Sequence, residues 1–169
     1  MIAIACVDKN NGIGKDGKLL ISIPEDMKFF RETTLNHVVC MGENTLLSFP
    51  NSKPLKNRIN IVLSQDPTHN YEGVINVHTF EDFLKTMKEH SKNDVVFVIG
   101  GASIYRQTLP YVDQVYLTKV NAVGGAEVFF VNLDEHLDFK LVKESQPEMD
   151  GDLEIKFTVY QNTNKKEIL

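Results

Sequence analysis

One stretch decides the fold class: Val95-Val96-Phe97-Val98-Ile99-Gly100-Gly101-Ala102-Ser103-Ile104-Tyr105. Its first five residues are apolar without alternation, which is typical of a strand covered on both faces of a parallel sheet. Glycine lets a ligand approach the backbone closely, and a helix start after two glycines favours phosphate. The stretch therefore predicts an α/β protein with a ligand-binding turn, and a tight turn with packed glycines is the structural alternative.

Strand and helix patterns alternate outward from this stretch. Apolar runs predict strands at residues 2–7, 37–41, 59–63, 74–77, 95–99, 114–120, 139–144 and 153–160. The alternation implies a largely parallel sheet with about four flanking helices, and the last two strands imply an antiparallel hairpin. We expect one domain over residues 1–161 and a frayed tail over residues 162–169.

The most informative acid is Asp26, in the stretch SIPEDMKFF at residues 22–30. Ser22 and Glu25 have the spacing of a capping box, and Pro24 suits a first helical turn, so a helix is predicted to begin here. Asp26 then lies on an apolar face, because positions three and four apart share a face. The carboxylate either has a function or only complements the positive end of the helix.

A glycine-rich loop follows the first strand. Gly12, Gly14 and Gly17 match the dinucleotide pattern G-x-G-x-x-G. No helix is predicted at the third glycine, because residues 19–24 remain extended up to a proline, so this fingerprint fails on context. We instead predict that residues 8–18 form a flexible flap that leads into the Asp26 helix.

Two other helix starts are predicted. Residues 42–45 form a strand-to-helix turn that offers free N–H groups to an anion. Thr79, which precedes Glu81 and Asp82, is the predicted N-cap of an amphipathic helix.

Composition excludes several classes of protein. The chain has 169 residues, 24% of them charged and 42% apolar, which suits one globular core. Its net charge of -5 gives no electrostatic reason to expect nucleic acid or an anionic membrane as a partner. The expected partners are therefore small molecules.

The cysteines indicate a reducing compartment, and the histidines give no sign of a metal site in the protein. Cys6 and Cys40 lie in apolar strand-like runs, as buried thiols do. The five histidines show no metal-ligand spacing, so no metal is predicted. No apolar run reaches the roughly 18 residues of a membrane span, and the N-terminus lacks a basic leader. We expect a cytoplasmic monomer.

Several short sequence blocks occur in a defined order along the chain. They are Val7-x-x-x-x-Gly12-Ile13-Gly14, Ile23-Pro24-x-Asp26, Thr34-Leu35-Asn36, Met41-Gly42, Pro54-Leu55 with Arg58, Leu63-Ser64, Val98-Ile99-Gly100-Gly101 with Tyr105, and Tyr116-Leu117-Thr118. In this order they resemble the dihydrofolate reductase family, from Ile2 to about Tyr160. The resemblance implies that family's α/β fold, a mostly parallel eight-stranded sheet with an antiparallel C-terminal strand.

The resemblance also implies an activity, the NADPH-dependent reduction of 7,8-dihydrofolate to tetrahydrofolate. Asp26 would grip the pterin amino group and ring nitrogen, with Thr118 holding its carboxylate, and these two are the implied catalytic residues. Arg58 would pair with the substrate's glutamate, and diaminopyrimidine antifolates would pair with Asp26. The implied substrate-binding residues are Ile4, Ala5, Asp26, Met27, Phe30, Phe49, Leu55, Arg58, Ile99, Tyr105 and Thr118.

The implied cofactor-binding residues surround the glycine turns. They are Cys6, Ile13, Gly14, Gly17, Lys18, Leu19, Gly42, Glu43, Asn44, Thr45, Leu63, Ser64, Gln65, His78, Ile99, Gly100, Gly101, Ala102, Ser103, Ile104 and Tyr105. Only Ser64 is typical where relatives bind the 2′-phosphate; the departures are Glu43, Gln65, His78 and Ser103. Because a carboxylate repels a phosphate, NADH is an alternative cofactor.

The flap region also departs from the family pattern. Leu20-Ile21 stands where Pro-Trp is usual, and Leu46 replaces a common aromatic residue. Glu127 stands where an aspartate often braces the flap, and Val131 replaces a usual proline. We expect the change at Glu127, a single methylene, to be tolerated.

Simple chemistry supports the role implied for Asp26. A carboxylate accepts two parallel hydrogen bonds from adjacent donors on a planar ring, and so orients it. The cofactor supplies only a hydride, so the proton comes from elsewhere. A carboxylate in an apolar pocket has a raised pKa, and Asp26 either donates the proton or favours a protonated substrate through its charge.

Two other functions remain open at this point. The first alternative is that this chain is a relative of the same fold that reduces another pterin-like or riboflavin-pathway substrate. Arg58 and the pair Asp26 and Thr118 favour a folate instead. A binding or structural protein with little turnover is the second alternative, suggested by the absence of tryptophan and the atypical phosphate site.

Overall fold

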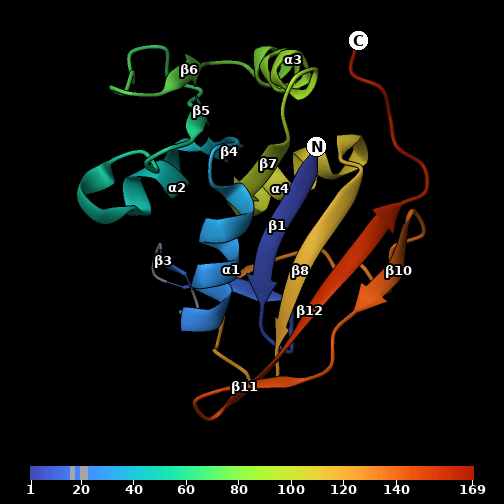
Figure 1. The fold of residues 1–169 in the computed structure, drawn as a ribbon. Helices are drawn as coiled ribbons and strands as arrows, with labels where there is room; N and C mark the ends of the chain where they lie inside the picture. Colours follow the sequence, from blue (N-terminus) through green and yellow to red (C-terminus); the bar gives the residue numbers. More distant parts are fainter. Residues whose placement is uncertain (16–17, 20–22) are drawn as a thin grey trace.

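A central sheet of mostly parallel strands carries the fold (Figure 1). The computed structural model describes residues 1–15, 18–19 and 23–169. The sheet's hydrogen-bonded order is β10 (Phe139–Glu144), β12 (Leu153–Asn162), β8 (Gln114–Val120), β1 (Ile2–Val7), β7 (Val96–Gly100), β4 (Val38–Gly42), β5 (Ile59–Leu63) and β6 (Ile75–Val77). A short strand, β11 (Glu148–Asp150), pairs with β12 outside this path.

The direction of the strands agrees with the prediction. Across the sheet, in the order β8, β1, β7, β4, β5 and β6, each strand is parallel to the next. β12 is antiparallel to both β8 and β10. A mostly parallel eight-stranded sheet with an antiparallel C-terminal strand is therefore confirmed.

Helices cover both faces of the sheet (Figure 1). The described part of the chain has four α-helices, α1 (Pro24–Thr34), α2 (Glu43–Ser48), α3 (Phe80–Ser91) and α4 (Ala102–Thr108), and two 3-10 turns, η1 (Pro50–Ser52) and η2 (Leu109–Tyr111). Thr79 caps α3 as predicted, because its side chain accepts a hydrogen bond of 3.1 Å from the N–H of Asp82. None of the described helices is long and apolar enough to cross a membrane.

The parallel strands are buried on both faces, which explains their unbroken apolar runs. In β1, Ala3 belongs to a core that contains the inner faces of α3 and α4. The next residue, Ile4, belongs to a second core that contains Leu46 of α2 and packs against Phe30 of α1. Alternate residues of one strand therefore hold helices on opposite sides of the sheet.

The predicted flap is in part a small sheet rather than a flexible loop. β2 (Gly12–Lys15) pairs with both β3 (Lys18–Leu19) and β9 (Val128–Phe129). The N–H of Glu127 donates to the carbonyl of Gly14 over 2.9 Å, so the segment before β9 does brace β2. Backbone pairing with a distant segment supplied this order, which composition does not reveal.

A buried aspartate that sequence reasoning missed organises the base of this sheet. Asp8 is 4% exposed. Its Oδ1 accepts hydrogen bonds from the N–H groups of Asn10 and Gly12 over 2.9 and 2.8 Å, and its Oδ2 accepts from Gly124 over 2.9 Å. These bonds hold the pKa of Asp8 below its usual value, so the carboxylate remains charged although it is buried.

The cap of α1 differs from the prediction. The helix begins at Pro24 with Ile23 as its N-cap, and no side chain of that residue caps it. The N–H of Glu25 instead donates to Oδ2 of Asp150 in β11, over 2.9 Å. The capping box was expected at Ser22, which lies outside the described residues; the observed cap comes from a segment remote in sequence.

The C-terminal tail is fastened to the domain, so the prediction of a frayed tail is wrong. β12 extends to Asn162, whose amide donates to the carbonyl of Val112 over 2.9 Å. The side chain of Ile168 is 6% exposed and joins the core below α3. Lys88 of α3 also donates to the carbonyl of Ile168 over 2.7 Å.

We predict that Ile168→Ala lowers the free energy of unfolding by about 2 kcal/mol, because it leaves a cavity in a closed core. The measurement is chemical denaturation. Leu169→Ala is the matched control, since Leu169 is fully exposed, and it should leave the stability unchanged. Equal effects of the two substitutions would contradict the burial of the tail.

Candidate active site

The carboxylate of Asp26 lies between α1 and the sheet. The hydroxyl of Thr118 donates a hydrogen bond of 2.6 Å to Oδ1 of Asp26, so the predicted contact between these residues is present. The thiol of Cys6 forms a hydrogen bond with the same carboxylate. Cys6 and Thr118 stand opposite each other in the register of β1 and β8, and both therefore face the helix. Sequence reasoning had placed Cys6 with the cofactor and missed its contact with Asp26.

Burial controls the ionisation of this group. It raises the pKa of Asp26, and the bonds from Thr118 and Cys6 offset part of that rise because they stabilise the charged form. Burial, followed by the charge of Asp26, also raises the pKa of the Cys6 thiol far above its usual value. Cys6 therefore remains a neutral donor, and Asp26 takes up a proton at a higher pH than an exposed carboxylate does.

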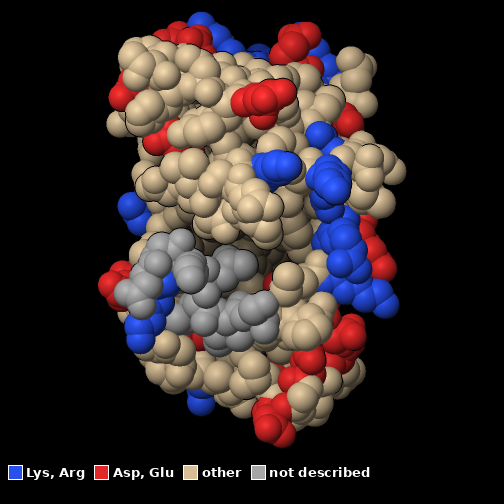
Figure 2. All heavy atoms as spheres, turned by 90° about the vertical axis from the view of Figure 1, so that its left-hand side faces the viewer, with Lys and Arg blue, Asp and Glu red and all other residues tan. Residues whose placement is uncertain are grey.

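A cleft of about 840 Å³ begins beside Cys6 and reaches the carboxyl ends of β4 and β5. Figure 2 shows a hollow near the centre of this face. Of the residues expected to bind the cofactor, those that line the cleft are Cys6, Ile13, Gly14, Gly42, Glu43, Asn44, Thr45, Leu63, Ser64, Gln65, Ile99, Gly100, Gly101, Ala102, Ser103, Ile104 and Tyr105.

The remaining expected cofactor residues lie elsewhere. Gly17 is outside the described residues, as are the side chains of Lys18 and Leu19. His78 is not in the lining: it stands behind Ser64, with its Nδ1 2.9 Å from that residue's carbonyl oxygen. Sequence reasoning missed other lining residues, which no motif marks: Lys15, Ser48, Asp66, Arg106, Gln107 and Val128.

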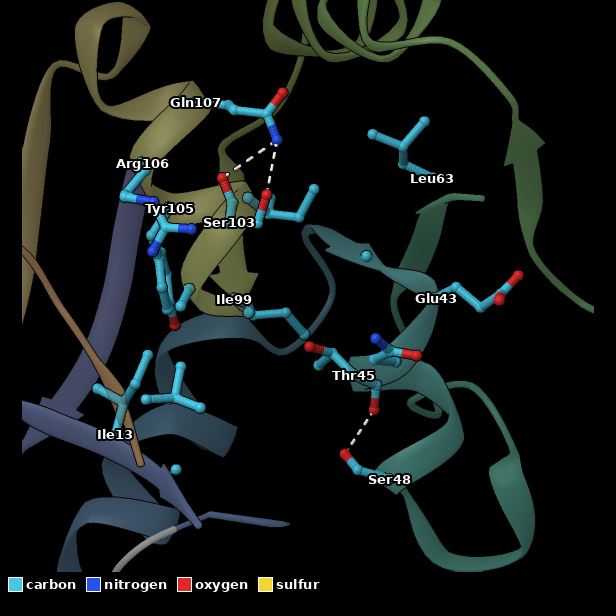
Figure 3. Close-up of a pocket in the computed structure, with 18 of the residues that line it drawn as sticks. Ile13, Glu43, Thr45, Ser48, Leu63, Ile99, Ser103, Tyr105, Arg106 and Gln107 are labelled. Atoms are coloured by element: carbon cyan, nitrogen blue, oxygen red, sulfur yellow. Dashed lines mark hydrogen bonds between the residues drawn. The ribbon is translucent and has the colours of Figure 1, made fainter. Parts of the chain in front are cut away.

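Glycines keep the middle of the cleft open. Gly100 has a φ of +132°, and a Cβ there would lie 3.4 Å from Oγ1 of Thr45. A Cβ on Gly42 would lie 3.0 Å from Cγ1 of Ile104. In Figure 3, α4 with Ser103 and α2 with Thr45 stand on opposite sides of this opening. Larger residues at either glycine would fill the space between the two helices.

An apolar wall stands beside Asp26. It contains Ile4, Phe30, Phe49, Leu55 and Ile99, five of the residues expected to bind substrate, in one hydrophobic cluster. Ala5 lines the cleft next to them. Met27 differs, because it is 51% exposed and is not part of this cluster.

Arg58 is held at the edge of this wall by neutral acceptors. Its Nε donates to Oγ1 of Thr34 over 2.8 Å, and its two terminal nitrogens donate to the carbonyls of Lys56 and Arg31 over 2.8 and 3.2 Å. Among the described residues, no acidic side chain forms an ion pair with it. The guanidinium is therefore oriented while its charge is not neutralised.

Tyr105 carries a buried hydroxyl. It is 5% exposed, and it donates a hydrogen bond of 2.6 Å to the carbonyl of Ile4. Its ring packs edge-on against Phe130 at 4.9 Å. Burial raises its pKa, so it stays neutral and ties α4 to β1 at the inner end of the cleft.

Comparison with known proteins agrees with this arrangement. The dihydrofolate reductase family matches residues 1–164. The dihydrofolate reductase of Bacillus subtilis is 33% identical over 163 residues, covering 95% of this chain and 94% of that protein. Dihydrofolate reductase type 9 of Escherichia coli is 32% identical over 166 residues, covering 95% and 92% of the two chains. A solved structure is also similar: dihydrofolate reductase from Enterococcus faecalis complexed with NADP(H) and RAB-propyl, with a TM-score of 0.83, 28% identity and 95% coverage of both chains.

The fold and the cleft define an α/β oxidoreductase with its site at the carboxyl ends of parallel strands. The chain belongs to the dihydrofolate reductase family, as its ordered sequence blocks indicated. The prediction of an enzyme of this family is confirmed. In the described part of the chain, no three histidine, cysteine or acidic side chains gather as a metal ion would require.

We predict that Thr118→Val raises the pKa of Asp26 further, because the lost hydrogen bond stabilised the charged form. The measurement is a pH titration of the Asp26 carboxyl carbon by NMR. Thr158→Val is the matched control: Thr158 is also buried in the sheet, but its hydroxyl donates to the carbonyl of Leu117. An unchanged pKa in Thr118→Val would contradict the role of this bond.

Proposed function

We propose that this chain reduces 7,8-dihydrofolate to 5,6,7,8-tetrahydrofolate with NADPH. The observation that carries the proposal is the partly buried carboxylate of Asp26, held by Thr118 and Cys6 beside a cleft of nucleotide size. A planar pterin presents adjacent donors, and a carboxylate fixed on one side can accept two parallel bonds from them. Asp26 then sets both the orientation of the ring and the class of substrate.

The residues present fit most of a nicotinamide dinucleotide. A Cβ would fill the opening at Gly42 and Gly100, so the chain leaves room there for a ligand. Ala5 and Ile99 line the inner end of the cleft, together with Cys6, and so would hold the nicotinamide. Ala102 and Ser103 begin α4 at the middle of the cleft and would face the pyrophosphate.

The chemistry divides between the cofactor and the chain. A bound nicotinamide supplies a hydride to carbon, and the ring nitrogen needs a proton. Among the described residues, we assign a part in that proton transfer to Asp26 alone. Its raised pKa suits either route, direct donation or stabilisation of a protonated substrate through its charge. The apolar wall excludes water and holds the two rings together, which replaces an encounter by an intramolecular step.

The apolar wall and Arg58 would hold the rest of the substrate. Phe30, Phe49 and Leu55 pack in one cluster and suit an aromatic ring between pterin and glutamate. Arg58 would bind the glutamate carboxylate, because its guanidinium is oriented and lacks an acidic partner among the described residues. Diaminopyrimidine antifolates would pair with Asp26 as the pterin does. We also propose that the enzyme acts as a monomer in the cytoplasm.

We predict that Asp26→Asn lowers the rate of dihydrofolate reduction at neutral pH by about 100-fold or more, since general acid and orienting roles are lost together. The same substitution should raise the melting temperature. The pKa of Asp26 is raised in the folded state, so burying its charge costs stability at neutral pH, and an amide removes this cost. The measurements are loss of nicotinamide absorbance and thermal unfolding.

Asp152→Asn is the matched control, because Asp152 is an exposed aspartate that does not line the cleft. Its rate and melting temperature should equal those of the unaltered chain. If Asp26→Asn kept full turnover, Asp26 would not be the residue that orients the pterin. A panel of other pterin and pyrimidine substrates, run beside dihydrofolate, tests the substrate class.

A further inference from the structure

One end of the cleft carries acidic groups where a cofactor's adenosine must lie. A dinucleotide whose nicotinamide lies beside Cys6 and Ile99 extends to the other end of the cleft, at the carboxyl ends of β4 and β5. That end is lined by Glu43, Ser64 and Asp66. Figure 3 shows Glu43 on the far side of α2 from Tyr105 and Arg106. This end therefore presents two carboxylates to the ligand.

Glu43 is fixed by three partners. His69 places its Nδ1 2.9 Å from Oε2 and 3.2 Å from Oε1 of Glu43. The hydroxyls of Ser64 and Tyr71 hydrogen-bond to the same carboxylate, and all these contacts hold the pKa of Glu43 below its usual value. Hydroxyl and imidazole donors that would suit a phosphate are therefore already engaged by a carboxylate.

The charged groups around His69 come from several elements. Glu43 begins α2, and Asp66, in the loop after β5, lies 3.3 Å from Nε2 of His69. His78, in the loop after β6, interacts electrostatically with Asp66, and Tyr71 bonds to Glu43. The cations of the cleft lining, Lys15 and Arg106, belong to β2 and α4.

These residues do not fit a 2′-phosphate. A phosphate dianion beside Glu43 is repelled, whereas a hydroxyl can donate a hydrogen bond to the same carboxylate. Carboxylates that bind the ribose hydroxyls of NAD use this chemistry in other nucleotide folds. His69 compensates the charge of Glu43 only while its imidazole is protonated.

We propose that Glu43, held by His69, is the residue that sets cofactor choice, accepting the 2′-hydroxyl of NADH and disfavouring the 2′-phosphate of NADPH. The chain then uses both cofactors. Its affinity for NADPH, relative to NADH, falls as the pH rises and His69 loses its proton. The proposal rests on the proposed function only in placing the nicotinamide beside Asp26.

The pH dependence has a definite direction. The hydrogen bond with Glu43 and the charges of Asp66 and Glu43 raise the pKa of His69. Below that pKa the imidazolium offsets the charge of Glu43, and above it the offset is lost. Binding of the 2′-phosphate should therefore weaken, relative to the 2′-hydroxyl, as the pH rises through the pKa of His69.

The test uses ADP-ribose and 2′-phospho-ADP-ribose, which lack the nicotinamide, with affinities measured by calorimetry from about pH 5.5 to about pH 8.5. In the unaltered chain the ratio of the two dissociation constants should shift against the phosphorylated ligand as the pH rises. Glu43→Gln should favour the phosphorylated ligand by about tenfold at the upper pH. Glu89→Gln, an exposed carboxylate of α3 outside the cleft lining, is the control and should leave the ratio unchanged.

The phosphate of the ligand also titrates near neutrality. The variant His69→Gln distinguishes the effect of His69 titration from the effect of phosphate titration. This variant keeps a hydrogen-bonding side chain and should show a flatter pH dependence than the unaltered chain. NMR titration should also show that Glu43→Gln lowers the pKa of His69. A strong preference for the phosphorylated ligand that Glu43→Gln does not alter would overturn the proposal, as would an unchanged pH dependence in His69→Gln.

Failure of this inference and failure of the proposed function give different results. Neither ligand takes part in turnover, so their affinities do not depend on dihydrofolate reduction. Turnover with NADPH alone, at all pH values, would overturn the inference and leave the function intact. Ligand affinities as expected, with no dihydrofolate reduction by either cofactor, would support the inference and contradict the function.

Discussion

The hydrogen bond between Thr118 and Asp26 joins α1 to the sheet, and the geometry of the candidate site depends on it. A carboxylate partly buried between α1 and β8 loses part of its hydration, which raises its pKa. Thr118 and Cys6 offset part of that cost from adjacent strands, because their register turns both side chains toward the helix. The parallel pairing of β1 with β8 thus makes possible a charged group in an apolar wall.

The rest of the molecule keeps a cleft open beside that group and holds the surrounding elements in place. Glycines at the ends of β4 and β7 leave the cleft open between α2 and α4. Asp8 fastens the base of the small sheet formed by β2, β3 and β9, and Asp150 caps α1 one residue before Asp26. Contacts between segments far apart in sequence therefore hold both α1 and the base of the small sheet. At the end of the cleft lined by Glu43 and Asp66, the charge is set by side chains that pair with His69.

Much of the fold was predictable because parallel strands buried on both faces leave unbroken apolar runs, as in β1 and β7. The pair Asp26 and Thr118 was also predictable, since ordered family blocks marked both residues. Asp8, Asp150 and His69 were not predictable. Each is a polar residue in a loop or at a strand end, and its role depends on a partner brought close only by folding.

The sequence by itself determined the α/β class and the order of strands and helices, because hydrophobic period and glycine placement are local properties. It also determined the membership of the family, because the ordered blocks can be read directly from the chain. Apart from the pair Asp26 and Thr118, which the family blocks marked, the tertiary structure decided which groups meet. It fastened Ile168 to the core, ordered part of the flap through β9, and paired Glu43 with His69. These contacts depend on distances between segments, and no local pattern of residues encodes a distance.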